Sequence, residues 1–358
     1  MVLRPAKGRS PPDALRGNMR TLIIGLGRIG RLVARDLIQN PAQRQWVGAV
    51  EVSTEAELFA YLLNHDSTYG HLDSAAIFTA NDSTLIAGQH TEIPLYQSVS
   101  EALKSCDPEL IIECSGDPNV ARTLADASTK GHFRVIFSSQ TDAVRGRDET
   151  FVWVEGVNHA AYNPAQHRLI VNPGCLNNCL IPALTAVNAY RTIVSGTFVS
   201  VHSVTNTQPV LDHIAKHARW SRAGFDNLIP AGHEPSQLIA RFFPALGQQL
   251  IGQTVRAPVS HTSYVTLTLQ TDKPLSTEGL SSAFRSSTVP AHVLGLDERA
   301  LVSSDYKFDG RSAIIDATNI RALAANTAFF SAWYNNEWAF AARMSDISKA
   351  IASHSYSR

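Results

Sequence analysis

The sequence predicts an α/β protein built from two parts, and three observations support that prediction. Between residue 20 and about residue 174, short apolar runs alternate with helical stretches, as in a parallel sheet covered by helices. A glycine-rich turn directly follows the first of these runs. Beyond residue 190 the runs become longer and alternate polar with apolar residues, which favours an antiparallel sheet. We therefore expect an α/β domain followed by an α+β domain with a mostly antiparallel sheet.

The first element is a buried strand over Arg20–Ile24, which leads into the turn Gly25-Leu26-Gly27-Arg28-Ile29-Gly30. Residues 31–38 then follow helical spacing. Strand, glycine turn and helix together indicate a Rossmann domain that binds a dinucleotide. The first glycine allows the tight turn, the second lets a pyrophosphate approach the backbone, and the third lets helix pack on strand. The expected cofactor-binding residues here are Gly25, Gly27, Arg28, Ile29 and Gly30.

Three later strands of the first domain end in residues suited to the same cofactor. Glu51 closes the run 46–50 and lies 21 positions after Gly30, where a carboxylate would bond the ribose hydroxyls and repel a 2′-phosphate. This favours NAD over NADP. The runs 110–116 and 134–139 end in small residues, which leave room for a ligand. We therefore add Ser115, Gly116 and Ser138 to the expected cofactor site, although simple turn chemistry explains such residues equally well.

Composition excludes several classes of function. The 358 residues include 31 basic and 31 acidic side chains, a balance that argues against nucleic-acid or membrane-surface binding. No apolar run approaches the roughly 20 residues needed to cross a bilayer. The four cysteines do not resemble a disulfide framework, and none has a partner pair at zinc-like spacing, so we expect no metal. A cytoplasmic protein is the expectation, with residues 1–18 as a disordered leader.

The chain also contains a candidate nucleophile and base. Cys175 is set in a Pro/Gly turn, and His202 arrives 27 positions later on a β-rich run. A free cysteine has a pKa of about 8.5, so it needs a basic or cationic neighbour to react well at neutral pH. Buried cysteines are common and usually inert, so the pair alone does not establish a catalytic site.

Six motifs, in order, resemble the glyceraldehyde-3-phosphate dehydrogenase family. Within that family, four features are more similar to the erythrose-4-phosphate dehydrogenase branch: Glu51, Ser203 after His202, and the stretches 241–244 and 312–316. The motifs lie at residues 25–31, 66–70, 156–159, 175–182, 255–258 and 333–338.

The resemblance implies a homotetramer and a division of the chain. After the leader, residues 19–174 would form the NAD-binding Rossmann domain and residues 175–336 the catalytic domain. A C-terminal helix within 337–358 would return to pack on the first domain.

The resemblance also implies roles for individual side chains. Cys175 would attack an aldehyde to form a hemithioacetal and then a thioester, with His202 as the base. Asn336 would bind the nicotinamide carboxamide. Arg256, with the hydroxyls of Thr205 and Thr207, would grip a substrate phosphate, and an intersubunit salt bridge is the alternative role for Arg256.

Two departures from the family pattern concern inorganic phosphate. Gly174 and Leu176 replace a serine and a threonine beside the nucleophile, and His233 and Glu234 replace a threonine and a glycine. A carboxylate would repel an attacking phosphate anion, whereas a protonated His233 could replace the lost donors and bind substrate. The sequence therefore predicts NAD-dependent oxidation of a sugar aldehyde such as glyceraldehyde 3-phosphate or erythrose 4-phosphate, with an altered phosphate-acceptor site.

Two alternatives stay open. One is a catalytically silent relative that binds a partner, which the altered anion site permits. The other is an aldehyde dehydrogenase for a different, unphosphorylated substrate; a semialdehyde dehydrogenase is disfavoured by the motif at 333–338.

Overall fold

The computed structural model describes residues 18–53, 55–72, 76–88, 90–139, 141–232 and 237–356. Residues 1–17 of the expected leader, and both His233 and Glu234, lie outside the described residues.

The first domain is a doubly wound sheet. Within the described residues it has nine strands in the order β10-β11-β9-β8-β1-β2-β7-β6-β5. The strands from β10 to β7 run parallel, and only β6 and β5 are added antiparallel at one edge. The strands are β1 (Met19–Ile24), β2 (Arg44–Val50), β5 (Phe78–Asn81), β6 (Thr84–Ala87), β7 (Thr91–Tyr96), β8 (Leu110–Glu113), β9 (Arg134–Phe137), β10 (Thr150–Val152) and β11 (Leu169–Val171).

Helices cover both faces of this sheet, as expected when every strand is buried on two sides. Apolar side chains of α1 (Arg28–Gln39), α2 (Ala56–Asn64) and α8 (Trp338–Tyr356) share one core with the sheet. Those of α3 (Val99–Cys106) and α4 (Pro118–Ser128) share the other. A two-stranded hairpin, β3 (His65–Asp66) and β4 (Gly70–His71), follows α2.

The second domain is built on a mixed sheet, eight-stranded within the described part of the chain. Most pairs are antiparallel, and β12 with β14 and β16 with β17 are parallel. The predicted fold class, a Rossmann domain plus an α+β domain with a mostly antiparallel sheet, is therefore confirmed. The strands are β12 (Ile193–Ser203), β13 (Ile229–Pro230), β14 (Leu250–Ala257), β15 (Ser263–Thr271), β16 (Leu294–Asp297), β17 (Ala313–Asp316), β18 (Arg321–Ala324) and β19 (Thr327–Tyr334).

Helices α5 (Cys175–Tyr190), α6 (Gln237–Phe242) and α7 (Thr277–Arg285) accompany the second sheet. Between Thr205 and Leu228 the chain forms an extended loop with one short 3₁₀ turn, η4 (Ala218–Ser221). The other 3₁₀ turns are η3 (His159–Ala161), η5 (Ser303–Tyr306) and η6 (Ala317–Asn319).

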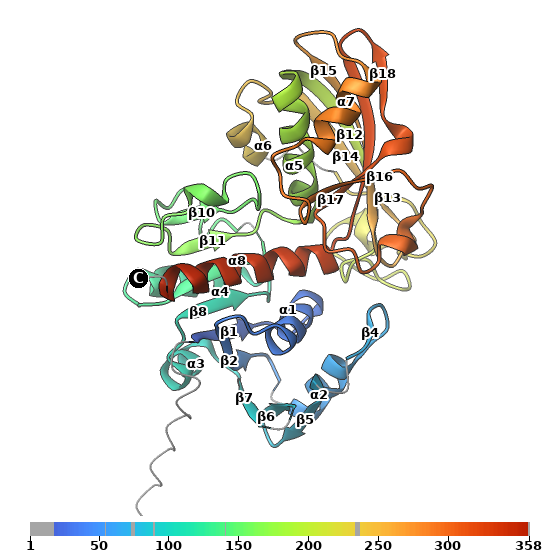
Figure 1. Cartoon of the computed structure of the whole chain (residues 1–358). Helices are drawn as coiled ribbons and strands as arrows, with labels where there is room; N and C mark the ends of the chain where they lie inside the picture. Colours follow the sequence, from blue (N-terminus) through green and yellow to red (C-terminus); the bar gives the residue numbers. More distant parts are fainter. Residues whose placement is uncertain are drawn as a thin grey trace, which may run out of the picture.

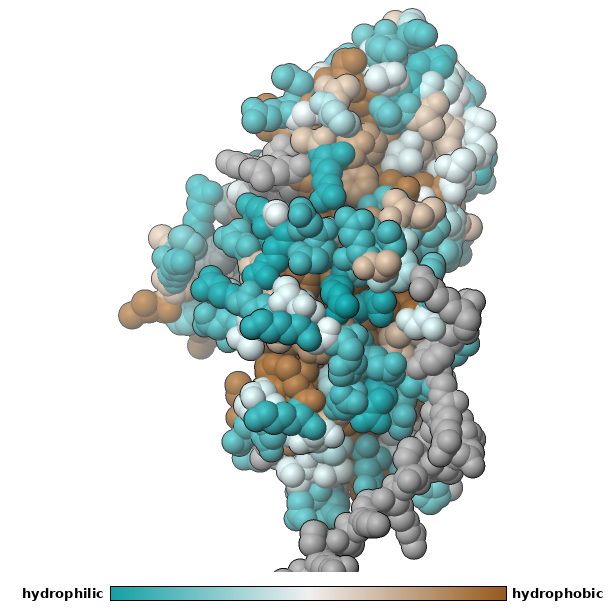
Figure 2. Space-filling view, turned by 90° about the vertical axis from the view of Figure 1, so that its left-hand side faces the viewer, coloured by the Kyte–Doolittle hydropathy of each residue, from teal (hydrophilic) through white to brown (hydrophobic). Residues whose placement is uncertain are grey.

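Helix α8 lies between the two halves of the molecule (Figure 1). Its buried Phe340, Met344 and Ile347 pack in the core that also holds α1. The buried guanidinium of Arg44 at the start of β2 donates to Ser348 Oγ at 2.7 Å. The face shown in Figure 2 is mainly hydrophilic across its middle, with smaller hydrophobic areas. No helix in the described residues is long and apolar enough to cross a membrane.

Candidate active site

Cys175 is the first residue of helix α5. The Pro/Gly turn ends at Gly174, which caps the helix in a left-handed conformation with φ of +97°. Because the first N–H groups of a helix have no partner within it, the helix start offers partial positive charge to an anion. A thiolate or an oxyanion at Cys175 would be stabilised there.

His202 on β12 faces this sulfur. Its Nε2 lies 3.5 Å from Cys175 Sγ, and its Nδ1 lies 2.7 Å from the carbonyl oxygen of Ser203. A carbonyl oxygen only accepts hydrogen bonds, so the contact with Ser203 favours the tautomer with the proton on Nδ1. In that neutral tautomer, Nε2 presents its lone pair to the thiol. This is the arrangement that a thiol and its proton acceptor require.

Burial raises the pKa of the Cys175 thiol, and the charge of Arg256 and the N–H groups of Leu176 and Cys175 itself act against that rise. The side chain keeps some solvent exposure, which weakens the effect of burial. The thiolate therefore depends on transfer of its proton to His202. Burial raises the pKa of Cys106, Cys114 and Cys179 as well, but His202 lies beside Cys175.

Arg256 lies on β14 directly beside His202, because the two residues are paired in the parallel register of β12 and β14. Its Nη1 contacts His202 Nδ1 and donates to the Ser203 carbonyl oxygen at 3.2 Å. Its buried Nε has no hydrogen-bond partner among the described residues. Burial lowers the pKa of this guanidinium, which shows that its charge is poorly solvated. An anionic ligand would balance this charge at the part of the side chain that remains exposed.

The two threonines expected to assist Arg256 lie close together at the start of the long loop. Thr205 Oγ1 and Thr207 Oγ1 are 3.0 Å apart. Gln208, which is mostly buried and was not singled out from the sequence, accepts from Thr205 Oγ1 at 3.0 Å and donates to Thr207 Oγ1 at 2.8 Å. The amide thus fixes both hydroxyls. Val204 N donates to Val259 O at 3.0 Å, so the loop leaves the sheet next to the end of β14.

Asn336, two residues after the end of β19, is joined to the same strand as the histidine. Its Oδ1 accepts from Ser203 Oγ at 2.6 Å. The preceding Asn335 begins α8, because its Oδ1 accepts from the N–H groups of Glu337 and Trp338 at 2.9 and 2.8 Å. The structure therefore brings Cys175, His202, Arg256 and Asn336 together around the end of β12.

The glycine turn fits a dinucleotide. A Cβ at Gly25 would lie 2.5 Å from Ser115 N, and one at Gly30 would lie 1.8 Å from Gly25 O, so both positions require glycine. A Cβ at Gly27 would meet nothing within 4 Å, which leaves the backbone open to a ligand. Helix α1 starts at Arg28 with no side-chain cap and no acidic residue in its first turn. Its free N–H groups can therefore meet a pyrophosphate.

The other expected cofactor residues surround this turn. Glu51 at the end of β2 accepts from Leu26 N within the turn and from Val52 N at 3.1 Å. Ser115 and Gly116 follow β8, and their N–H groups donate to the buried Glu113 carboxylate at 2.7 and 3.2 Å. Ser138 follows β9, and Ile29 packs against the core beneath α1.

The side chain of Arg28 has a partner that the glycine motif does not reveal. Its Nη2 lies 2.7 Å from Glu337 Oε2, and its Nη1 pairs with Asp66. Asp66 also accepts from Tyr69 N at 2.9 Å, and Tyr69 OH donates to Asn335 Oδ1 at 3.1 Å. This network connects α1, the hairpin β3–β4 and the start of α8. The backbone N–H of Arg28, in the first turn of α1, remains available to the cofactor.

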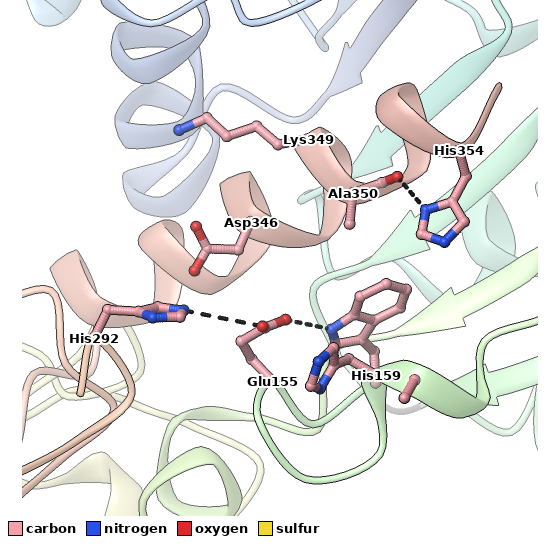
Figure 3. A pocket seen from close by; sticks show the side chains of 9 residues that line it. Glu155, His159, His292, Asp346, Lys349, Ala350 and His354 are labelled. Carbon is pink, nitrogen blue, oxygen red and sulfur yellow. Dashed lines mark hydrogen bonds and ion pairs between the residues drawn. The ribbon is translucent and has the colours of Figure 1, made fainter. Parts of the chain in front are cut away.

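A separate hollow of 310 Å³ lies between the loop after β10 and α8 (Figure 3). Glu155 lies 3.9 Å from His292 Nε2 and accepts from Trp153 Nε1 at 2.8 Å, whereas Lys349 points away toward Asp36. Within the described residues, no three His, Cys, Asp or Glu side chains are grouped so that they could hold a metal ion. The hollow shares no lining residue with the site around Cys175.

Comparisons with known proteins agree with this geometry. A family model described as the NAD binding domain of glyceraldehyde 3-phosphate dehydrogenase matches residues 19–120, and a model of the C-terminal domain of that enzyme matches residues 174–336. Glyceraldehyde-3-phosphate dehydrogenase of Chlamydia muridarum is 32% identical over 94% of this chain and 100% of its own length. Glyceraldehyde-3-phosphate dehydrogenase 3 of Nostoc sp. is 30% identical, over 93% of this chain and 98% of its own length. Glyceraldehyde-3-phosphate dehydrogenase 1 of Bacillus subtilis is also 30% identical, over 92% of this chain and 97% of its own length. The chain is therefore an NAD-binding dehydrogenase that belongs to the glyceraldehyde-3-phosphate dehydrogenase family.

Proposed function

We propose that the chain oxidises a phosphorylated sugar aldehyde through a thioester on Cys175. The observation that carries this proposal is the 3.5 Å contact between Cys175 Sγ and His202 Nε2 at the start of α5. The thiolate adds to the aldehyde carbon, and the N–H groups at the start of α5 stabilise the oxyanion. His202 Nε2, which carries the proton taken from Cys175, returns it to this oxygen to give a hydroxyl, and takes it back as the carbon loses hydride. NAD, when bound, accepts that hydride, and the carbon becomes a thioester.

Arg256 is proposed to bind the substrate phosphate. Its position beside His202 places a cation next to the reacting sulfur, and its charge opposes the rise in the pKa of the Cys175 thiol. A guanidinium can grip a phosphate with two parallel hydrogen bonds, which fixes the aldehyde as well as attracting it. Thr205 and Thr207 are proposed to add hydroxyl donors. Thr207 accepts from Gln208 and keeps its own proton, whereas Thr205 must turn its proton from Gln208 Oε1 to the phosphate. His233 is proposed to add a further donor to the substrate.

We further propose that the thioester passes to an acceptor other than inorganic phosphate. Leu176 is buried in the core, and Gly174 carries no side chain, so neither neighbour of the nucleophile offers a hydroxyl to a phosphate anion. A Cβ at Gly174 would meet nothing within 4 Å, so the space beside the sulfur stays open. Water or another small nucleophile can approach through such a space.

Activity assays separate these proposals. NADH formation is measured with glyceraldehyde 3-phosphate, erythrose 4-phosphate and their unphosphorylated counterparts, each with and without inorganic phosphate. We expect activity with a phosphorylated aldehyde in the absence of inorganic phosphate. Erythrose 4-phosphate is favoured by the features that resemble the erythrose-4-phosphate dehydrogenase branch, namely Glu51, Ser203 and the stretches 241–244 and 312–316. A strict requirement for inorganic phosphate would refute the altered acceptor site. No NADH from any aldehyde, with Cys175→Ser indistinguishable from the native chain, would refute the proposed activity.

A homotetramer is part of the same proposal. The long loop between β12 and β13 exposes several large apolar side chains to solvent, which a single chain would normally cover. Contact with other copies of the chain would bury them. Sedimentation that shows a monomer at micromolar concentration would contradict this assignment. The side chains are Val210, Leu211, Ile214, Phe225 and Leu228.

A further inference from the structure

The last residue of β12 links three groups of the site. Ser203 is 1% exposed, and each of its polar atoms has a partner. Its carbonyl oxygen accepts from His202 Nδ1 at 2.7 Å and from Arg256 Nη1 at 3.2 Å. Its hydroxyl donates to Asn336 Oδ1 at 2.6 Å, and its N–H donates to Ser263 Oγ at 3.1 Å. The carbonyl is backbone, so only the hydroxyl depends on the residue being serine.

That hydroxyl decides which way the Asn336 amide faces. The hydroxyl proton of Ser203 goes to the amide oxygen, so the NH₂ group points away from Ser203. A flipped amide could donate to Ser203 Oγ, but it would leave the hydroxyl proton of this buried serine without an acceptor among the described residues. Asn336 as a whole is 7% exposed. Among the described residues, the side-chain atoms that are both fully buried and without a hydrogen-bond partner do not include Asn336 Nδ2. The structure gives Nδ2 no acceptor within the described part of the chain. The NH₂ group is therefore a donor held toward a space that solvent reaches.

We propose that Ser203 is a positioning residue that orients Asn336 so that its NH₂ group donates to the carboxamide oxygen of the nicotinamide. The inference rests on the proposed function, because it takes Asn336 as the nicotinamide contact. Without the hydroxyl, the amide can flip by rotation about its last bond and present its oxygen instead, which repels the carboxamide oxygen. Ser203 thereby selects how the nicotinamide ring sits beside Cys175.

Binding measurements with Ser203→Ala test this role. We expect NAD affinity to fall about fivefold, as for the loss of one hydrogen bond. Affinity for ADP-ribose, which lacks the nicotinamide, should not change. The rate of Cys175 alkylation should also stay the same, because the Ser203 carbonyl still holds His202. Ser203→Thr, which keeps the hydroxyl, should restore NAD affinity. Ser203→Cys preserves the volume with a much weaker donor and should match the alanine variant, which covers a failure of Ser203→Ala to fold.

Two controls make the role specific. Ser200 is equally buried on the same strand, but its hydroxyl bonds Tyr334 OH at 2.7 Å, so Ser200→Ala should leave the ratio of NAD to ADP-ribose affinity unchanged. In an Asn336→Ala background, Ser203→Ala should cost no further NAD affinity, because two residues that act through one contact are not additive.

The face of the nicotinamide that takes the hydride provides a further readout. With aldehyde deuterated at C1, the native chain should label one face of NADH, and Ser203→Ala should label both. An equal loss of NAD affinity in the native and Asn336→Ala backgrounds, or an equal loss for ADP-ribose, would overturn the inference. Failure of the native chain to bind NAD or ADP-ribose would instead refute the proposed function.

Discussion

Replacement of Arg256 by glutamine should separate phosphate recognition from the chemistry at Cys175. Arg256 is a half-buried cation beside His202, and its buried Nε has no partner among the described residues. Glutamine has hydrogen-bond donors of its own, but it has no charge and lacks the two parallel N–H donors of a guanidinium. The substrate phosphate would therefore lose a charge-assisted pair, whereas an unphosphorylated aldehyde would lose only the support that Arg256 gives to the Ser203 carbonyl.

The expected magnitude follows from the geometry. Two unit charges about 4 Å apart near a protein surface interact by about 4 kcal/mol. Truncation of one partner of a buried, hydrogen-bonded charge pair costs about 2–5 kcal/mol. A loss of about 3 kcal/mol corresponds to roughly a hundredfold change in a rate constant. We therefore expect the ratio of kcat/KM for phosphorylated over unphosphorylated aldehyde to fall about a hundredfold in Arg256→Gln. Arg256→Lys, which keeps the charge without the fork, should lose about tenfold.

The assay is steady-state NADH formation with glyceraldehyde 3-phosphate and with glyceraldehyde, compared in the native chain and both variants. The ratio removes any general damage to the site, because such damage lowers both rates. An equal fall for the two substrates would show that Arg256 supports His202 and does not bind phosphate. The reasoning would then be refuted, even though the variant is inactive.

Three further predictions concern stability and cofactor choice. Burial favours the neutral form of Asp66, but the Tyr69 N–H and the charge of Arg28 outweigh it and hold the Asp66 pKa below its usual 3.8. The stabilisation is therefore complete above pH 3.8 and is lost as the pH falls below that value. Asp66→Asn should lower the free energy of unfolding by about 2 kcal/mol at neutral pH. The difference between the native chain and the variant should shrink below pH 3.8. A difference that stays constant with pH in urea titrations would contradict this. Glu51→Ala should lower the affinity for NAD about tenfold and raise the preference for NADP over NAD. An unchanged ratio of the KM values for the two cofactors would contradict a contact between Glu51 and the ribose. Met344→Ala in α8 should lower the free energy of unfolding, measured in urea, by about 2–5 kcal/mol, because the side chain is fully buried. A decrease below about 1 kcal/mol would show that α8 does not stabilise the first domain.

The sequence predicted the elements of the first domain well, because their signals are local. The run 20–24 became β1 with one added residue, and the helical spacing of 31–38 became the body of α1. The glycine turn required glycine at 25 and 30 for steric reasons that the spacing already indicates.

Helix α5 was missed, and its surroundings explain why. It is buried on nearly every side, so its apolar residues do not recur with a helical period. Pro182 lies in its interior, where proline usually argues against a helix. Cys175 was therefore read as a turn residue, although it begins a helix of 16 residues. The helix start adds a positive end beneath the sulfur that the Cys/His pattern alone did not predict.

Partners distant along the chain were also beyond the sequence. Arg28 and Glu337 are 309 positions apart, and neither motif alone indicates that they form an ion pair. The contact of Ser203 with Asn336 spans 133 positions and forms only in the folded sheet, where β12 and β19 lie on either side of β15. Gln208 had no pattern to mark it, because its role lies in fixing Thr205 and Thr207.

The most direct test of the account is the pH dependence of iodoacetamide alkylation, with each cysteine followed by mass spectrometry. The structure places His202 beside Cys175, so we predict rapid alkylation of Cys175 that persists well below the ordinary thiol pKa of about 8.5. His202→Ala should abolish that fast phase, because burial alone raises the pKa of the Cys175 thiol. Cys106, Cys114 and Cys179 serve as internal controls and should react slowly in both proteins. Equal, slow alkylation of Cys175 with and without His202 would contradict the proposed thiolate and the chemistry built on it.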